Sequence, residues 1–168
     1  NVNHESPSTE ARVVEKSILR NKSKSLFKGM IRIKENAAKS NSFLSGRSIL
    51  LDKDAKSDAI PSLEIFTNDV KATHSASVAQ IDEEQIFYLK TRCLTHAESE
   101  RIIIEGFLEP LSRKMSIQVR AWIAYLIESK WENRELTINT DEELTKFVEI
   151  EETRYNEDSE IEQHYKYR

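Results

Sequence analysis

The chain has 168 residues, a net charge of −4, 38% hydrophobic residues and 32% charged residues. This length suits one domain of ordinary size with a small appendage. No apolar run approaches the roughly 20 residues that a transmembrane helix needs, so we expect no membrane attachment. The single cysteine, Cys93, excludes an internal disulfide framework and indicates a reducing compartment, the cytoplasm or, in a eukaryote, an organelle stroma.

The charge is distributed unevenly along the chain. Residues 1–81 carry 13 Lys and Arg against 9 Asp and Glu, whereas residues 82–168 carry 12 against 20. The basic residues of the first part are spread over alternating positions of the predicted strands, which is typical of solvated faces. A nucleic-acid site would instead concentrate them on one element, with aromatic residues between them. We therefore predict no nucleic-acid partner.

Residues 12–81 contain short apolar segments with a period of two, which predicts β-strands. Hairpin dipeptides such as Asn-Gly are absent, and the polar connections are too short for crossover helices. Such strands favour a parallel β-helix, in which each coil buries its apolar positions against its neighbours; a β-sandwich is the competing prediction. The segments are VVEKSIL (13–19), SLFKGMIRI (25–33), SFLSGRSILL (42–51) and IPSLEIF (60–66).

At Asp82 the pattern changes to that of amphipathic helices. Asp82 with Gln85, and Thr95 with Glu98, have the spacing of residues that cap helix N-termini, so they predict the starts of two helices. Pro110 is expected to end or bend the second of these helices.

Two further helices are predicted over 116–131 and 140–155, the latter opened by Thr140 and Glu143. The remaining C-terminal residues are highly charged, and residues 141–162 contain ten acidic residues against two basic ones, which is typical of a solvated face. Apolar residues that recur every three or four positions are expected to be buried. They are Ile86, Leu89 and Cys93, then Ile103, Phe107 and Leu111, and finally Val119, Ile123, Leu126 and Ile127.

The sequence around the change from strands to helices resembles that of the SufB/SufD family of iron–sulfur cluster assembly proteins. The matching text is NDVKATHSASVAQIDEEQIFYLKTR (68–92) followed by AESERIIIEGF (97–107). Two coils of that family are matched more loosely, by SLFKGMIRI (25–33) and by AAKSNSFLSGRSILL (37–51). The resemblance covers about residues 4–113, and we expect the chain to be the C-terminal half of a longer family member.

The resemblance implies a mainly β fold with some α structure. A right-handed parallel β-helix would occupy residues 1–81, a small helical domain that caps it would occupy 82–131, and 132–168 would be an acidic helical extension. The family's subunits pair through their β-helices, so the expected partner is a SufB-type subunit or a second copy of this chain. Residues 82–113 would dock a SufC-type ATPase, with Arg92, Glu98 and Glu105 as candidate contacts.

The resemblance also makes His74 a candidate ligand of an iron–sulfur cluster that is transient and shared at a subunit interface. One histidine cannot hold a cluster by itself, so no tightly bound cofactor is expected on this chain alone. SufB-type members have a cysteine near Gly46 and a glutamate at Ser75, and SufD-type members often have a cysteine at Ala72. These differences favour the SufD type, and we do not expect this subunit to accept sulfur.

No paired carboxylates, phosphate-binding glycine loop or catalytic triad is recognisable, so we do not expect an enzyme. The predicted function is that of a scaffold subunit in the SUF system. Two alternatives stay open at this point. One is a degenerate SufB/SufD paralogue that self-associates without assembling clusters. The other is a carbohydrate-active β-helix protein, although the acidic groove that cleavage of a polysaccharide requires is missing.

Overall fold

The computed structural model describes residues 1–113, 115–132 and 145–153. The chain divides into two compact units, Asn1–Glu105 and Gly106–Arg168. The first unit contains all the strands that the structure describes, the first helix and the beginning of the second helix. No helix in the described ranges is long and apolar enough to cross a membrane.

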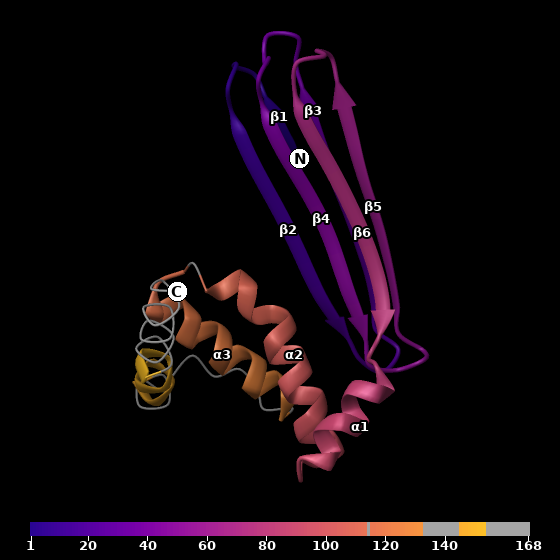
Figure 1. Ribbon diagram of the computed structural model, residues 1–168, viewed down its shortest axis with the longest axis vertical. Helices are drawn as coiled ribbons and strands as arrows, with labels where there is room; N and C mark the ends of the chain where they lie inside the picture. The colour runs from indigo at the N-terminus through magenta and orange to yellow at the C-terminus, as the bar shows by residue number, and fades with distance from the viewer. Residues whose placement is uncertain (114, 133–144, 154–168) are drawn as a thin grey trace, which may run out of the picture. The chain divides into compact units, whose positions relative to one another are not determined.

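Six strands of the first unit form two three-stranded sheets (Figure 1). One sheet has the order β1-β3-β5 and the other the order β2-β4-β6, so consecutive strands alternate between the sheets. All four strand pairings are parallel, unlike the antiparallel ladders of common β-sandwiches. The strands are β1 (Val2–His4), β2 (Glu10–Leu19), β3 (Lys24–Ile33), β4 (Asn41–Leu50), β5 (Lys56–Ile65) and β6 (Lys71–Gln80).

The register of the strands repeats at intervals of close to thirty residues. Glu10 pairs with Asn41 and Asn41 with Lys71, while in the other sheet Lys24 pairs with Lys56. Each repeat therefore contributes one strand to each sheet. The four apolar segments predicted as strands are confirmed as β2 to β5, and β6 also lies within the region 12–81 that is predicted to form strands.

Apolar and small polar side chains share the interior of this unit. Ile31, Ile33 and Leu44 are almost fully buried and lie at the centre of the apolar core. The hydroxyl of Ser48 on β4 is hydrogen-bonded to that of Ser17 on β2 (2.8 Å) and to that of Ser57 on β5 (2.7 Å). Buried hydroxyl groups are tolerated because each of them finds a partner.

The helices α1 (Glu83–Thr91) and α2 (His96–Ser112) begin where the capping patterns predict. The Asp82 side chain accepts a hydrogen bond from the backbone N–H of Glu84 (2.9 Å). Thr95 and Glu98 bond reciprocally, since the amide and hydroxyl of Thr95 donate to one Glu98 oxygen and the Glu98 amide donates to the Thr95 hydroxyl. Pro110 does not end α2, which continues to Ser112.

The predicted burial of Cys93 is wrong. Helix α1 ends at Thr91, and Cys93 is exposed with a φ of 66°. Its backbone N–H donates to the carbonyl of Lys90 (3.1 Å). This left-handed conformation closes the end of a helix, so Cys93 lies beyond the helix rather than on the stripe shared by Ile86 and Leu89.

In the second unit the predicted third helix is confirmed as α3 (Ile117–Trp131), but its predicted apolar stripe is wrong at two of its four positions, since only Ile123 and Ile127 are half-buried. Val119 and Leu126 are exposed, whereas Tyr125 is buried. The Tyr125 ring packs edge-on against Phe147 of the helical residues 145–153, with 5.8 Å between the ring centroids. The same two segments are joined by a buried ion pair between Arg120 and Glu151 (2.8 Å), and the predicted cap at Thr140 and Glu143 lies outside the described residues.

Candidate functional site

Strand β6 lies at the edge of its sheet and carries His74 near its middle. Among the described residues, its only pairing is with β4. In the register of the sheet, His74 continues the row formed by Val13 and Leu44. Leu44 is buried, but His74 is exposed because no further strand covers it in the described part of the chain.

The imidazole of His74 makes no hydrogen bond to any residue that the structure describes. Its nitrogens are therefore available to an external partner, and a neutral imidazole can ligate iron. No group of three His, Cys, Asp or Glu side chains suited to a metal ion occurs in the described ranges. Any cluster at His74 would consequently need further ligands from outside these residues.

The position of Gly46, near which the resemblance places a cysteine in SufB-type members, has no room for a side chain. A Cβ atom added there would lie only 2.7 Å from Cδ1 of Phe27 and 3.4 Å from an oxygen of Glu15. The Phe27 ring thus occupies the space that a cysteine would need. This packing supplies a physical reason for glycine at this point of β4.

The other two positions that distinguish the SufB and SufD types are also part of the strand packing. The Ser75 hydroxyl is half-buried and donates to the Ser45 hydroxyl (3.0 Å). Ala72 packs against the apolar core of the unit. Neither side chain offers a ligand beside His74.

His4 is a buried histidine whose two ring nitrogens are both satisfied, a role that its sequence position did not reveal. The Thr9 hydroxyl donates to the carbonyl of Ser6 (3.2 Å), so it can only accept from Nδ1 of His4 (2.6 Å) and from Ser40 (2.9 Å). Nε2 then accepts a hydrogen bond from Ser42 (3.1 Å) in the neutral ring. This network is structural, because all of its polar atoms are used within the fold.

Of the two other histidines, only His96 lies in the described part of the chain. His96 lies in the first turn of α2, and its Nδ1 is 3.7 Å from an oxygen of Glu100. His164 lies outside the described residues.

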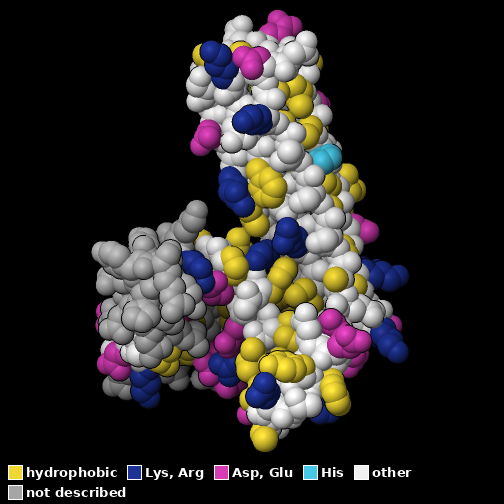
Figure 2. All heavy atoms as spheres, in the orientation of Figure 1, with side chains coloured by type: hydrophobic (Ala, Val, Ile, Leu, Met, Phe, Trp, Pro, Cys, Tyr) yellow, Lys and Arg dark blue, Asp and Glu magenta, His cyan; other side chains and the backbone are white. Residues whose placement is uncertain are grey.

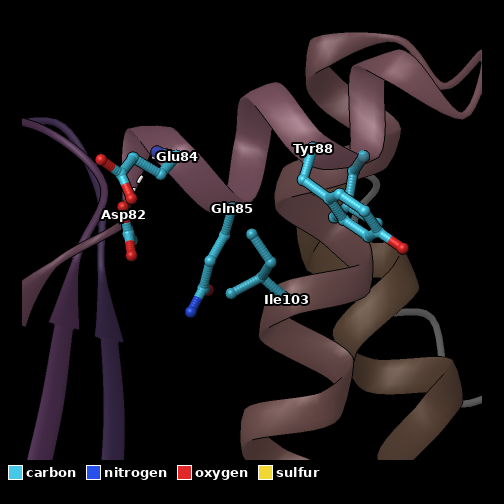
Figure 3. Close-up of a pocket in the computed structure, with 6 residues that line it drawn as sticks. Asp82, Glu84, Gln85, Tyr88 and Ile103 are labelled. Carbon is cyan, nitrogen blue, oxygen red and sulfur yellow. Dashed lines mark hydrogen bonds between the residues drawn. The ribbon is translucent and has the colours of Figure 1, made fainter.

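A shallow pocket of about 400 Å³ lies between α1 and the first part of α2 (Figure 3). Gln85 and Ile103 point toward one another from the two helices, and Asp82 and Glu84 lie at the start of α1. Tyr88 lies at the other end of the pocket. The lining is mainly apolar, with carboxylates at one end, and it belongs entirely to the first unit.

Two exposed aromatic side chains of α1, one of which lines this pocket, were not singled out from the sequence. In the segment IFYL of α1, Ile86 is buried, while Phe87 is 70% exposed and Tyr88 is 56% exposed. Helical geometry places neighbouring residues on different faces, so the anchoring of Ile86 directs the next two side chains outward. Large exposed aromatic residues of this kind are enriched where proteins bind one another.

The three predicted partner contacts have partners within the chain. Arg92 lies over the Tyr88 ring (5.3 Å to its centroid) and donates to its hydroxyl (3.2 Å). Glu105 is paired with Arg101 (2.8 Å). Glu98 serves the N-terminal cap of α2, as described above. Arg92 directly follows α1 and Glu105 lies on α2, the two helices that border the pocket.

Glu98 gives an expected pH dependence. Hydrogen bonds from Thr95, chiefly from its backbone amide and next from its hydroxyl, hold the pKa of Glu98 below its usual range. A carboxylate with a lowered pKa stabilises the fold above its unfolded pKa of about 4.3, and this stabilisation is lost as the pH falls through the folded pKa. Replacement Glu98→Gln should lower helix content at neutral pH and reduce its change in this acid range, as measured by circular dichroism. Glu35→Gln, at an exposed loop position, is the control and should leave both quantities unchanged.

Comparison with known proteins gives a match that covers the whole of the first unit. The family model described as "SUF system FeS cluster assembly, SufBD core domain" matches residues 1–107. This chain belongs to the SufBD family. Its relatives include proteins named "Iron-sulfur cluster assembly SufBD family protein" from Staphylococcus haemolyticus, Staphylococcus epidermidis and Staphylococcus aureus. Each is 30% identical over 129 residues, which are 77% of this chain.

The SufBD match covers only part of this chain, and the chain covers only part of its relatives. The matched residues contain all six strands, α1 and the larger part of α2, and they end before α3. The chain spans 28% of the length of these staphylococcal relatives. The family assignment therefore rests on the unit that carries His74 and the pocket.

Proposed function

We propose that this chain is part of a non-enzymatic scaffold subunit on which the SUF system assembles iron–sulfur clusters. The observation that carries the proposal is the SufBD core match over residues 1–107. We further propose that the two parallel sheets are coils of a right-handed β-helix. The regular register and the alternation of strands between sheets support this description.

The proposed pairing surface for a SufB-type subunit is the free edge of β6. Exposed sheet edges are ordinarily protected by charged residues or proline. β5, the last strand of the other sheet, has Pro61 together with Asp58 and Glu64, whereas Lys71 is the only charged residue of β6 and the strand has no proline. The unprotected edge is therefore the better candidate for pairing with another chain, and such pairing would place His74 at the interface.

The proposed docking site for a SufC-type ATPase is the helical surface of residues 82–113. Tyr88 lines a shallow, mainly apolar pocket, and Phe87 is the neighbouring exposed ring on α1. A pocket with an aromatic border supplies apolar contact, and carboxylates at its end can steer a basic partner surface. The proposed location of the assembly is the cytoplasm or, in a eukaryote, an organelle stroma.

In this proposal the iron–sulfur cluster is cargo, and His74 supplies one ligand from this subunit. Replacement His74→Ala should leave the unfolding transition unchanged, because the side chain is exposed and lacks a hydrogen bond to any described residue. It should lower the yield of clusters formed by the assembled complex at least about threefold, since a lost ligand weakens a shared site. The measurement is cluster absorbance after anaerobic reconstitution of the complex.

His96→Ala is the matched control, since His96 is also an exposed histidine but lies on α2. Its cluster yield should equal that of the unaltered complex. A normal yield with His74→Ala would remove His74 from the shared site.

A further inference from the structure

Helix α3 of the second unit exposes apolar residues and buries a charged one. Four apolar residues of the helix and of its N-terminal flank are between 38% and 45% exposed, namely Met115, Val119, Trp122 and Leu126. We call these four residues the α3 stripe. Arg120, by contrast, is buried in the ion pair described above. This inverts the usual pattern of a surface helix, whose outer face is polar, and such exposed apolar residues mark surfaces that bind another molecule.

The exposed positions of α3 carry almost no charge. They are Gln118, Val119, Trp122, Leu126 and Lys130, of which only Lys130 is charged. In the first unit, by comparison, Figure 2 shows charged side chains interspersed with apolar ones over the strands and α1. A nucleic acid or an anionic lipid surface would require several basic residues on this face. The occupant that suits the α3 stripe is therefore an apolar protein surface.

The Trp122 side chain is already ordered by contacts within its own unit. Its ring packs edge-on against the ring of Tyr125, with 6.1 Å between the centroids and an angle of 84° between the planes. Tyr125 is itself buried and packs against Phe147. An ordered ring loses little conformational entropy on binding, and Trp is among the residues that contribute most to protein interfaces.

The spacing of the α3 stripe is that of a seam between two helices. Val119, Trp122 and Leu126 follow one another at intervals of three and four residues, which is the repeat of paired helices. In an antiparallel pair of two copies about a two-fold axis, Val119 of each copy would face Trp122 of the other. Leu126 would then face Met115. The largest side chain thus meets the smallest one, which is the combination that fills a layer between helices.

The one exposed charge of α3 favours the same antiparallel arrangement. Lys130 lies at the C-terminal end of the helix. In a parallel pair the two Lys130 side chains would lie side by side and repel one another. In the antiparallel pair they would be about 28 Å apart along the helix axis, at 1.5 Å per residue, and their repulsion would be screened.

We propose that the α3 stripe is an interface between two copies of this chain, with their α3 helices packed antiparallel. The stripe exposes roughly 300 Å² of apolar surface, the lower end of the range for the largest patch on a monomer. A stable interface buries about 800 Å² on each partner, so the dimer forms only at high concentrations of the chain. The stripe is separate from the β6 edge and from the helical surface 82–113, since all of its residues follow residue 113.

Sedimentation of the full chain at concentrations from about 1 μM to about 200 μM tests the proposal. The unaltered chain should change from monomer to dimer within this range. Leu126→Glu should remain a monomer throughout, because dimerisation would bury an unpaired carboxylate against Met115. Leu126→Gln keeps the test decisive if the glutamate prevents folding, and it should weaken association at least about tenfold.

Ile102→Glu is the matched control, since Ile102 is 45% exposed but lies on α2 in the first unit. Its association should stay within about twofold of that of the unaltered chain. Circular dichroism of each variant shows whether its helices are retained.

Disulfide cross-linking tests the antiparallel orientation. All chains carry Cys93→Ser, which removes the single cysteine. A mixture of Met115→Cys chains and Leu126→Cys chains should give a disulfide dimer that contains one chain of each kind. Leu126→Cys chains alone should give none, because their two cysteines would be about 16 Å apart along the axis and a disulfide spans at most about 7 Å between Cα atoms.

Three results would overturn the proposal. A chain that stays monomeric at the highest concentration would leave the stripe to another protein or to another part of this chain. Association that survives Leu126→Glu would lie on a different surface, and equal loss in Ile102→Glu would show that association depends on net charge. A disulfide dimer formed by Leu126→Cys chains alone would contradict the antiparallel packing.

Discussion

Replacement of Phe87 and Tyr88 together by alanine is expected to weaken binding of a SufC-type ATPase at least about 100-fold. Truncation of an aromatic residue at the centre of an interface costs about 2 kcal/mol or more. The two residues are adjacent on α1, both rings are largely exposed, and Tyr88 lines the pocket. Most of their surface is available to a partner, so truncation should act on binding far more than on folding.

The fold of α1 should survive this double replacement. Ile86 holds the helix against the rest of the unit and is almost fully buried, and the cap at Asp82 is unaffected. Tyr88 does contact Arg92, but an exposed pair of this kind contributes little to stability. Binding can be measured by isothermal titration calorimetry, with thermal unfolding followed in parallel.

Phe66→Ala is the matched control for this experiment. Phe66 is 57% exposed, close to the 56% of Tyr88. It directly follows β5 and does not lie on α1. Its loss should leave ATPase affinity unchanged. If Phe66→Ala weakened binding as much as the double replacement, or if the double replacement had no effect, the helical surface would not be the dock.

Replacement Ile31→Ala is expected to lower the free energy of unfolding by about 3 kcal/mol. Ile31 is fully buried near the C-terminal end of β3, where it pairs in register with Val2 on β1 and with Leu63 on β5. Removal of its methyl and methylene groups loses apolar burial and leaves a cavity that the flanking strands cannot fill. Urea unfolding measured by circular dichroism supplies the value.

Leu26→Ala tests the same chemistry on the same strand. Leu26 is 58% exposed, so its replacement should change the free energy of unfolding by less than about 0.5 kcal/mol. Equal destabilisation by the two variants would mean that the interior of the sheets is not where the stability of this unit lies.

The strands and the helix starts could be predicted because their causes are local. Alternating apolar residues give β2 to β5, and a side-chain oxygen at Asp82 or Thr95 satisfies amides that lie only two or three residues away. Cys93 was placed wrongly because the pattern of the helix continued past the point where the backbone turns left-handed. Nothing in the spacing of apolar residues marks such a helix end when glycine is absent.

The burial of α3 could not be predicted because it depends on a distant segment. Residues 145–153 bring Phe147 against Tyr125 and Glu151 against Arg120, so a face with a charged residue becomes the buried one. The exposed face then carries Val119 and Leu126. The positions of apolar residues along one helix predict the wrong buried face in such a case. A charged side chain can be buried only when its oppositely charged partner is in place.

The candidate site was predicted residue by residue but not as a surface. His74 could be predicted as a candidate ligand from the resemblance of the sequence to the SufB/SufD family. Its exposure depends on the position of β6 at the edge of the sheet. The sequence gives no sign that Arg12, Arg47 and Lys71 belong together, because Arg47 is 35 positions after Arg12 and Lys71 is 24 positions after Arg47. Only the register of β2, β4 and β6 shows that they share one face.

The central claim is that this subunit works in cluster assembly only as part of a complex. Anaerobic reconstitution with iron and sulfide, followed by absorbance of the cluster, tests it most directly. The chain alone should give no stable cluster, and the chain with a SufB-type subunit and a SufC-type ATPase should give one. A stoichiometric cluster on the isolated chain, or none in the complete complex, would contradict the claim.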